Sequence, residues 1–359
     1  MKYKDLSISV YLFLILFIYS SLYAKTDISI NLMSGYNFIN EEQTENNFEN
    51  FPNRFFSKNR EIIPTGFAIV NTLGYPNGIS KIRRFPHLEF GIAAGGGLLE
   101  YTRKDDYKDD NPVIPFGGFN GGLHIGTGIN NKFDITFKLF FFSLDWISSL
   151  AAEHEGYGET TYYKIEIDES YAMSVGFKLR YNMFNRLIIR PMFFNFGGVS
   201  LNLGFDYMKG SIDSLFTFSD RQNVDLDVGT IDVVSYASGE GSLEWNILSI
   251  TPEALVYFDL FSVISLYTGP SVSLNFGYVN FDFEATGNFI AQTGSPVEGD
   301  IGDVELKSTN YLVADIIIPK WIVGIEIDIY SVKLQLEGST ILTSMNDSFT
   351  AQIGIRTQF

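Results

Sequence analysis

The chain has 359 residues and a formal net charge of −17, from 25 Lys and Arg against 42 Asp and Glu. This acidic balance excludes nucleic acid as a partner, because its phosphates would be repelled. Cysteine is absent, which excludes disulfides, thiolate metal sites, cysteine nucleophiles and a lipid anchor on a cysteine. Any attachment to a membrane must therefore come from the fold itself.

The N-terminal stretch, residues 1–24, has the pattern of a secretory signal peptide. Lys2 and Lys4 carry positive charge, an uninterrupted apolar run covers 10–19, and Ala24 stands where a peptidase would cut. The apolar run is shorter than the roughly 20 residues of a spanning helix. An anchoring N-terminal helix is the alternative interpretation. We expect a mature chain of residues 25–359.

Apolar and polar residues alternate in many segments, which indicates strands with one apolar and one polar face. At the C-terminus, Phe349, Ile353, Ile355 and Phe359 share one face, and Gln352 lies on the other. The same alternation recurs in segments that begin at Phe133, Met173, Val199, Val272 and Trp321. Aromatic residues make up 16% of the chain, although no apolar run after residue 24 reaches the length of a spanning helix.

These features predict an all-β fold, a transmembrane antiparallel β-barrel, in which every second side chain faces lipid. A soluble β-sandwich also alternates, but it explains neither the aromatic content nor the C-terminal phenylalanine. Short and long connections alternate along the chain, as in barrels with short periplasmic turns and long external loops. The short links are at 130–132, 182–186, 258–262 and 330–331, and the long polar links are at 102–111, 148–160, 210–241, 283–309 and 344–348.

About ten strands follow from this pattern over residues 86–359, and residues 25–85 are less regular. Thr26–Phe38 is predicted as the first strand, and Ala68–Leu73 as a second strand or as a helix folded into the lumen. Counting both as strands gives about 12, with a range of about 10 to 14, since bacterial barrels have even numbers. We expect a single barrel with no second domain.

Two stretches, Thr65–Gly78 and Phe85–Gly97, resemble spirochaetal outer-membrane barrels. Within these, the chain looks like the Lsa-type surface proteins and, more distantly, the fatty-acid-transporter-like barrels. The resemblance covers a small part of the chain. It implies exposure on the cell surface and, for some members of the family, binding of host matrix or plasma proteins.

No catalytic, cofactor or metal site is expected, and the chain is not predicted to be an enzyme. The histidines His87, His124 and His154 lack the three or four converging ligands of a zinc site. The run Ala93–Gly97 is not followed by the Gly-Lys-Ser/Thr of a phosphate loop, and glycine there fits a bend or a closely packed plug. No Gly-x-Ser-x-Gly elbow occurs. Acidic clusters in the long links are interpreted as solvated surface.

Two sets of residues are predicted to have specific roles. Phe359, Thr357 and Ile355 form the terminal signal for the barrel-insertion machinery. Charges close to the short turns are predicted to point into the lumen and to pair there, because an unpaired buried charge is costly. The predicted network is Asp134, Lys178, Arg180, Glu326, Asp328, Lys333 and Arg356, joined by Arg83 and Arg84.

Two functions are expected from this architecture. One is an integral outer-membrane surface protein with a closed lumen, whose loops serve adhesion or interaction with external partners. The alternative is a narrow pore or transporter for small or apolar solutes. A barrel of about 12 strands has a narrow interior that mixed charges can close, which favours the surface protein. Membrane lipid, the insertion machinery and an extracellular protein are the expected partners.

Overall fold

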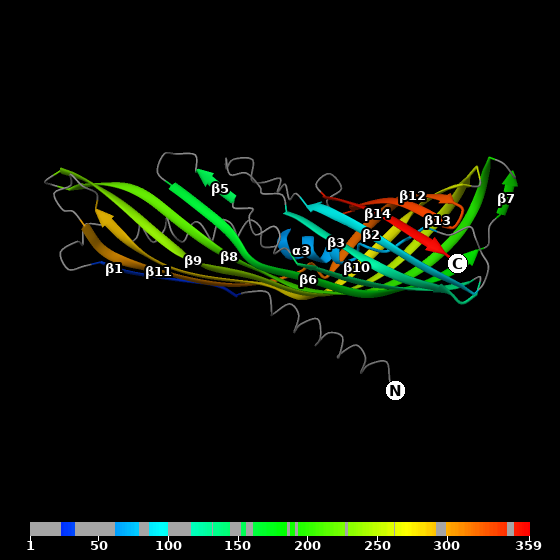
Figure 1. The fold of residues 1–359 in the computed structure, drawn as a ribbon, viewed down its shortest axis with the longest axis horizontal. Coiled ribbons are helices and arrows are strands. Elements are labelled where there is room, and N and C mark those ends of the chain that lie inside the picture. The colour runs from blue at the N-terminus through cyan, green and yellow to red at the C-terminus, as the bar shows by residue number, and fades with distance from the viewer. Residues whose placement is uncertain are drawn as a thin grey trace, which may run out of the picture.

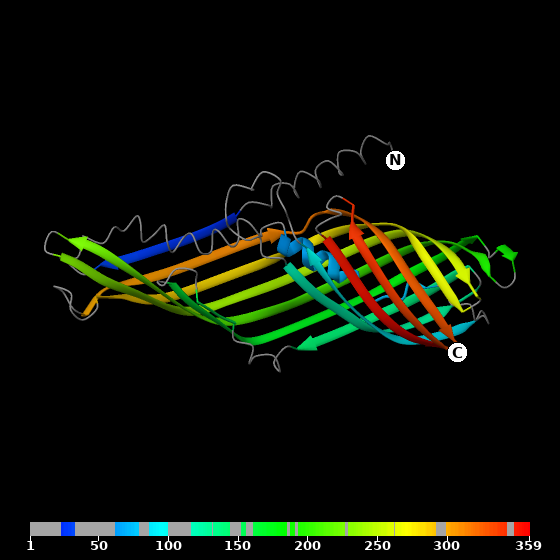
Figure 2. The same ribbon diagram turned by 90° about the horizontal axis from the view of Figure 1, so that it is seen from above.

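The computed structural model describes residues 23–32, 62–78, 86–99, 116–130, 132–143, 152–155, 161–184, 187–190, 193–226, 229–261, 263–291, 299–342 and 348–359. Within these ranges the chain forms antiparallel strands and one helix, α3 (Ile62–Asn71). The molecule is elongated, with a barrel at one end and a long sheet that continues from it at the other (Figures 1 and 2). Among the described residues, no helix is long and apolar enough to cross a membrane.

Ten of the described strands pair side by side into a closed ring, in the order β2, β3, β4, β6, β8, β9, β10, β12, β13 and β14, with β14 paired back to β2. Their bounds are β2 (His87–Leu99), β3 (Phe116–Gly128), β4 (Phe133–Ser143), β6 (Thr161–Phe184), β8 (Phe194–Leu226), β9 (Gly229–Leu260), β10 (Ile264–Ala291), β12 (Ile317–Ile329), β13 (Val332–Ile341) and β14 (Ser348–Gln358). Closure leaves no sheet edge, which is why a β-structure can span a bilayer.

Toward the turn between β12 and β13, which we call the lower end, the barrel wall is apolar on its outer face and polar on its inner face. Phe137, Phe177 and Ile353 are exposed on the outer face, while Asn202 and Asn275 are buried on the inner face. Hydrocarbon contacts the first set, and the second set lines the lumen. The chain is therefore a transmembrane β-barrel of the outer membrane. Since short turns of such barrels are periplasmic, the end that carries the turn between β12 and β13 is the periplasmic end.

Strands β6, β8, β9 and β10 are much longer than a bilayer requires and continue past the barrel. There they form an open sheet with β11 (Gly299–Val313), β1 (Tyr23–Leu32) and β5 (Ala152–Glu155), which we call the outer extension. β10 pairs with β12 over its lower half and with β11 over its upper half, so β11 and β12 follow one another along the same neighbour. β7 (Leu187–Arg190) is a short addition at the periplasmic end.

Polarity inverts where the strands leave the barrel. In β9, Leu248 is exposed on the outer face and Ser249 is fully buried on the inner face. A few residues higher, Glu244 is exposed on the outer face, and Trp245 and Ile247 are buried on the inner face. β8 and β10 change in the same way. The outer face of the extension is thus suited to water, and its inner face is apolar and packs against α3 at its base.

This inversion corrects the predicted long links at 210–241 and 283–309. β8 and β9 run through the first, and meet where Leu226 pairs with Gly229; β10 and β11 occupy most of the second. The polar residues that indicated loops lie on the water-facing side of strands whose apolar side faces inward. Short strand β5 also lies within the predicted link at 148–160.

The N-terminal expectations are met in part. The first strand covers Tyr23–Leu32, whereas the prediction was Thr26–Phe38, and residues 33–38 lie outside the described residues. β1 pairs only with β11 among the described strands and is not in the ring. Ala68–Leu73 is not a strand: most of it belongs to α3, the lumenal helix that was the alternative. Of the expected signal peptide, residues 1–24, the first 22 lie outside the described residues, and Tyr23 and Ala24 begin β1.

Candidate functional site

The interior of the barrel is filled by the chain itself. Helix α3 and the following residues 72–78, which we call the lumenal segment together, lie inside the ring (Figure 1). The helix packs on the apolar inner face of the outer extension, where the rings of Phe67 and Trp245 stack at 4.5 Å between centroids. Ile63, Ile69 and Leu73 belong to the same buried cluster. A helix that is apolar on most sides is stable only when it is enclosed in this way.

Glycines in β2 and β3 leave room for the lumenal segment. A Cβ atom at Gly118 would lie 3.0 Å from the Val70 side chain, and one at Gly97 would lie 3.4 Å from it. Gly74 has a φ of +92°, which is unfavourable for a residue with a side chain, and Gly121 approaches it closely. The glycine run in β2 is thus the place where a plug packs against the wall.

Below the helix, the wall holds the end of α3 by its backbone. Lys138 in β4 donates hydrogen bonds from its Nζ to the carbonyl oxygens of Asn71 and Leu73, both at 2.8 Å. The same Nζ forms an ion pair at 2.7 Å with Asp206 in β8, and both side chains are almost fully buried. The Asn71 amide donates to the carbonyl oxygens of Asp206 and Ile247. The free carbonyls at the C-terminus of the helix are therefore satisfied by the barrel wall.

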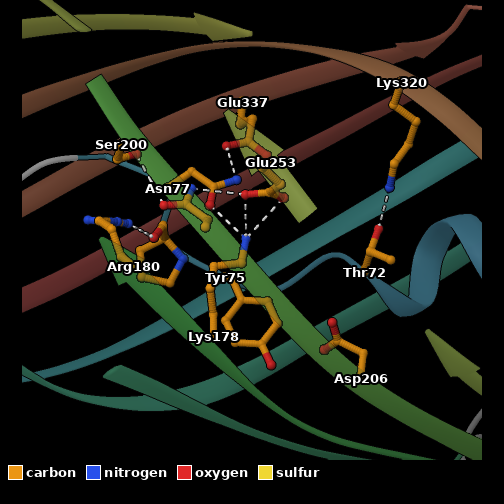
Figure 3. Close-up of polar contacts among 12 residues, drawn as sticks. Thr72, Tyr75, Asn77, Lys178, Arg180, Ser200, Asp206, Glu253, Lys320 and Glu337 are labelled. Carbon is orange, nitrogen blue, oxygen red and sulfur yellow. Dashed lines mark hydrogen bonds and ion pairs between the residues drawn. The ribbon is translucent and has the colours of Figure 1, made fainter. Parts of the chain in front are cut away.

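Further down, Tyr75 and Asn77 lie among charged side chains (Figure 3). The Tyr75 ring is near two ammonium groups, Lys138 at 4.7 Å and Lys178 at 4.9 Å from its centroid. Lys178 also donates to the Asn77 Oδ1 at 2.7 Å and pairs with Glu253 at 3.1 Å. These contacts hold two cations against one aromatic ring in a space from which bulk water is excluded, where such attraction is strong.

Glu337 in β13 accepts hydrogen bonds from both the lumenal segment and the barrel wall at this level. Its Oε2 accepts hydrogen bonds from the Asn77 amide and the Tyr267 hydroxyl, both at 2.8 Å. Its Oε1 accepts from Gln352 at 2.7 Å. Gln352 in turn donates to the Tyr75 carbonyl, and its own carbonyl oxygen accepts from the Gly74 amide. One buried carboxylate thus links three strands to the lumenal segment.

The last described residue of the segment, Gly78, is held between two guanidinium groups near the periplasmic end. Its carbonyl oxygen accepts from Arg180 at 2.9 Å and from Arg356 at 2.7 Å. Arg356 is neutralised by Glu89 at 3.0 Å and by Glu326. Planar guanidinium groups can serve a carbonyl and a carboxylate at once, which a lysine cannot do with the same geometry.

The predicted lumen residues divide into several groups. Arg356 with Glu326, and Lys333 with Asp328 at 2.5 Å, form ion pairs within the predicted set. Lys178 and Arg180 are buried in the lumen, but their contacts are to Glu253 and to the segment's carbonyls, rather than to members of the set. Asp134 is only half-buried and accepts a long hydrogen bond of 3.5 Å from Asn182. Arg83 and Arg84 lie outside the described residues.

Several residues of the site were missed by sequence reasoning, chiefly Glu89, Lys138, Asp206, Glu253 and Glu337. Lys138 and Asp206 were visible as single charges in the wet positions of alternating segments. A charge that the pattern places in a narrow lumen is a candidate wherever it lies along the strand. The prediction restricted itself to charges near the short turns and so omitted the middle of the barrel.

The three histidines are not arranged as a metal site among the described residues. His124 is buried in the lumen beside Gly91, and His87 lies at the start of β2. The side chain of His154 is not among the described ones. Within the described residues, no group of three or more His, Asp and Glu is arranged to hold a metal ion.

In the terminal strand, Ile355 and Phe359 are exposed on the outer face with the half-buried Thr357, and the Phe359 amide donates to the Leu88 carbonyl at 2.9 Å.

Comparison with known protein families shows to which family this barrel belongs. A sequence model described as Lsa36-like matches residues 156–359, more than half of the chain. The chain belongs to the Lsa36-like family. The match begins in the strands that build the outer extension and runs to the C-terminus, so it leaves out the lumenal segment and the first three strands of the ring. No curated protein matches the sequence.

Solved structures similar to this chain include several membrane barrels. The transport unit of the autotransporter AIDA-I from Escherichia coli is 10% identical with a TM-score of 0.32, over 83% of this chain and 99% of that one. Ail of Yersinia pestis is 8% identical with a TM-score of 0.22, over 76% and 99%. The toluene transporter TodX of P. putida is 8% identical with a TM-score of 0.22, over 82% and 92%. Similarity this weak carries no argument about function.

Proposed function

We propose that this Lsa36-like barrel is a surface protein with a closed lumen, whose outer extension binds external protein partners. The observation that carries the proposal is the lumenal segment, which occupies the barrel from its outer part almost to its periplasmic end. The buried side chains of Lys138 and Arg180 bind its backbone carbonyl groups. Lys138 and Lys178 are in turn paired with buried carboxylates of the wall. Displacing the segment would leave these charges unpaired, which is costly.

The outer extension supports the second half of the proposal. It is a continuous sheet well outside the bilayer, with polar and charged side chains on its outer face, such as Glu244 and Asp282, and exposed Tyr236 and Leu215 among them. A rigid surface of mixed character suits recognition of another protein. We further propose that the chain is not an enzyme.

The closed lumen is tested by conductance in a planar bilayer. The intact chain should show no stable conductance steps, whereas a variant without residues 62–78 should show them, because the segment that fills the lumen is gone. Heat-modifiable migration of both proteins checks that each is folded. Stable steps from the intact chain would contradict the closed lumen and support the alternative, a narrow pore.

Binding by the extension is tested by shortening one hairpin. Asp213 and Ser242 are opposite one another in the register of β8 and β9, so residues 214–241 can be replaced by a short turn without disturbing the barrel. Cells that display the intact chain should adhere to at least one of a panel of coated matrix and plasma proteins, and cells with the shortened chain should adhere less. Equal adhesion of both would contradict the proposal.

A further inference from the structure

The path of the chain before β2 determines on which side of the membrane β1 lies. β14 ends at the periplasmic rim, where Leu88 and Phe359 exchange backbone hydrogen bonds at 3.1 and 2.9 Å. β2 therefore begins at that rim and rises from there. The later strands of the ring alternate in direction from this start, and the outer extension lies at the opposite end of the molecule (Figure 2).

β1 lies entirely within the outer extension. Tyr23 is opposite Tyr311, and Leu32 is opposite Gly302, in the register with β11. Gly302 is in turn opposite Phe289, close to the outer end of β10. β1 thus starts on the side nearer the membrane and runs outward to a level near the tips of the hairpins. The whole strand is above the level at which the wall changes from apolar to polar on its outer face.

The lumenal segment runs the other way, from the outer end of the lumen toward the periplasm. Along β9, the contacts of the segment descend in order: Phe67 stacks on Trp245, the Asn71 amide donates to Ser249, and the Asn77 carbonyl accepts from Tyr257. Along β14 the order is the same, with Gly74 at Gln352 and Gly78 at Arg356. After residue 78 the chain reaches the start of β2 at the periplasmic rim.

From these two paths we infer that the barrel displays its own N-terminal end on the cell surface. β1 lies outside the membrane, and the chain then returns to the periplasmic side through the lumen. The lumenal segment is consequently a tether, and the buried contacts of Lys138, Arg180 and Arg356 with its carbonyls hold it in place. This function goes beyond the proposed one, and it holds whether or not the lumen conducts ions.

The inference has a consequence for assembly. A chain exported with its N-terminus in the periplasm must pass β1 across the outer membrane before the barrel is complete. The segment bears no charge between Ile62 and Gly78, since the charged groups of the site all belong to the wall. The part of the chain that remains in the lumen is thus neutral, and the cations that bind its carbonyl groups belong to the wall.

The absence of cysteine from the chain makes topology directly measurable. Ser29→Cys places a thiol in β1, opposite the exposed Glu305. Thr309→Cys, on the exposed side of β11, is the control for the outer side, and Ser331→Cys, in the exposed turn between β12 and β13, is the control for the periplasm. Each variant is expressed in the outer membrane of intact cells and treated with a membrane-impermeant maleimide that shifts the protein on a gel.

The inference expects Ser29→Cys and Thr309→Cys to be modified in intact cells, and Ser331→Cys only after the outer membrane is permeabilised. Modification of Ser29→Cys only after permeabilisation would overturn the inference. If that thiol is shielded under both conditions, an epitope inserted between Ala24 and Lys25 decides instead. Antibody binding to intact cells then supports surface display, and binding confined to permeabilised cells refutes it. Heat-modifiable migration confirms that every variant is folded.

Discussion

Individual cations in the lumen serve backbone carbonyls as well as carboxylates. Lys138 binds two carbonyl oxygens and one carboxylate, and Arg356 binds one carbonyl oxygen and two carboxylates. A fully buried ion pair is weak evidence of stability when considered alone, because desolvation offsets the attraction. Here each cation also satisfies polar groups that would otherwise be buried without a partner, so its removal has a cost beyond the loss of one ion pair.

Replacing Lys138 by methionine tests this role. Lys138→Met leaves Asp206 as an uncompensated buried charge and frees two carbonyl groups, so we expect a loss of about 3–5 kcal/mol in the free energy of unfolding. The measurement is urea unfolding of the protein in lipid vesicles, followed by heat-modifiable migration. The double variant Lys138→Met with Asp206→Asn should recover part of the loss, since it removes the unpaired charge.

The matched control is an exposed ion pair of the same kind. Lys307 pairs with Glu284 at 3.1 Å, but both side chains are about 60% exposed. Lys307→Met should therefore cost no more than about 1 kcal/mol. Equal losses in the two lysine variants would show that the wall does not hold the lumenal segment through Lys138.

At the scale of the strand, the same alternation serves two opposite environments. The lower halves of β8, β9 and β10 turn apolar side chains to lipid, and their upper halves turn them inward. No break in the strands marks the change, because the hydrogen-bonded ladder between β8 and β9 is continuous from Gly198 to Leu226. Only the identity of the side chains changes, since the backbone pairing does not depend on what surrounds it.

Two outward residues with similar exposure test where the change occurs. Phe177 in β6 is 39% exposed within the barrel, and Leu215 in β8 is 42% exposed above it. Phe177→Arg should destabilise the protein by about 2–4 kcal/mol, because it places a charge near the middle of the bilayer. Leu215→Arg should be close to neutral, because its surroundings are water. Equal effects in vesicle unfolding would refute the assigned membrane level.

The terminal strand permits a prediction about insertion. Phe359 is 75% exposed and its ring is 6.4 Å from that of Phe90, at the seam where β14 meets β2. Phe359→Ala should lower the fraction of heat-modifiable protein in the outer membrane, because the insertion signal is weakened. Phe349→Ala, at the other end of the same strand, should have a smaller effect. The prediction fails if both variants insert as well as the original chain.

The sequence indicates the barrel well and the extension poorly, and the reason is physical. In an alternating segment such as Phe349–Phe359, the apolar side chains are the ones that face lipid, and the segment was recognised as a transmembrane strand. In the extension the apolar side chains face inward instead, so that the polar residues Asp213 and Glu284 on the outer face were interpreted as parts of loops. The lumenal segment could not be derived in detail, because its partners, such as Glu337 and Gln352, are more than 250 residues away in the sequence.

For the whole molecule, the described parts form one continuous unit in which the tether, the wall and the extension depend on one another. α3 covers the apolar inner face at the base of the extension, and the residues after it close the lumen. The family match begins only at residue 156, so it includes the wall from β6 onward but neither the segment nor β2, β3 and β4, which also contact it. The barrel and its tether are thus contributed by different parts of the chain.

The length of β8 determines how far from the cell this protein can act. From Lys209, where its outer face becomes polar, β8 continues to Leu226, and a rise of about 3.4 Å per residue gives roughly 58 Å along the strand. With a tilt of about 45°, the hairpin tip stands about 40 Å above the edge of the hydrocarbon core. A partner can therefore bind at the hairpin tip without approaching the bilayer itself.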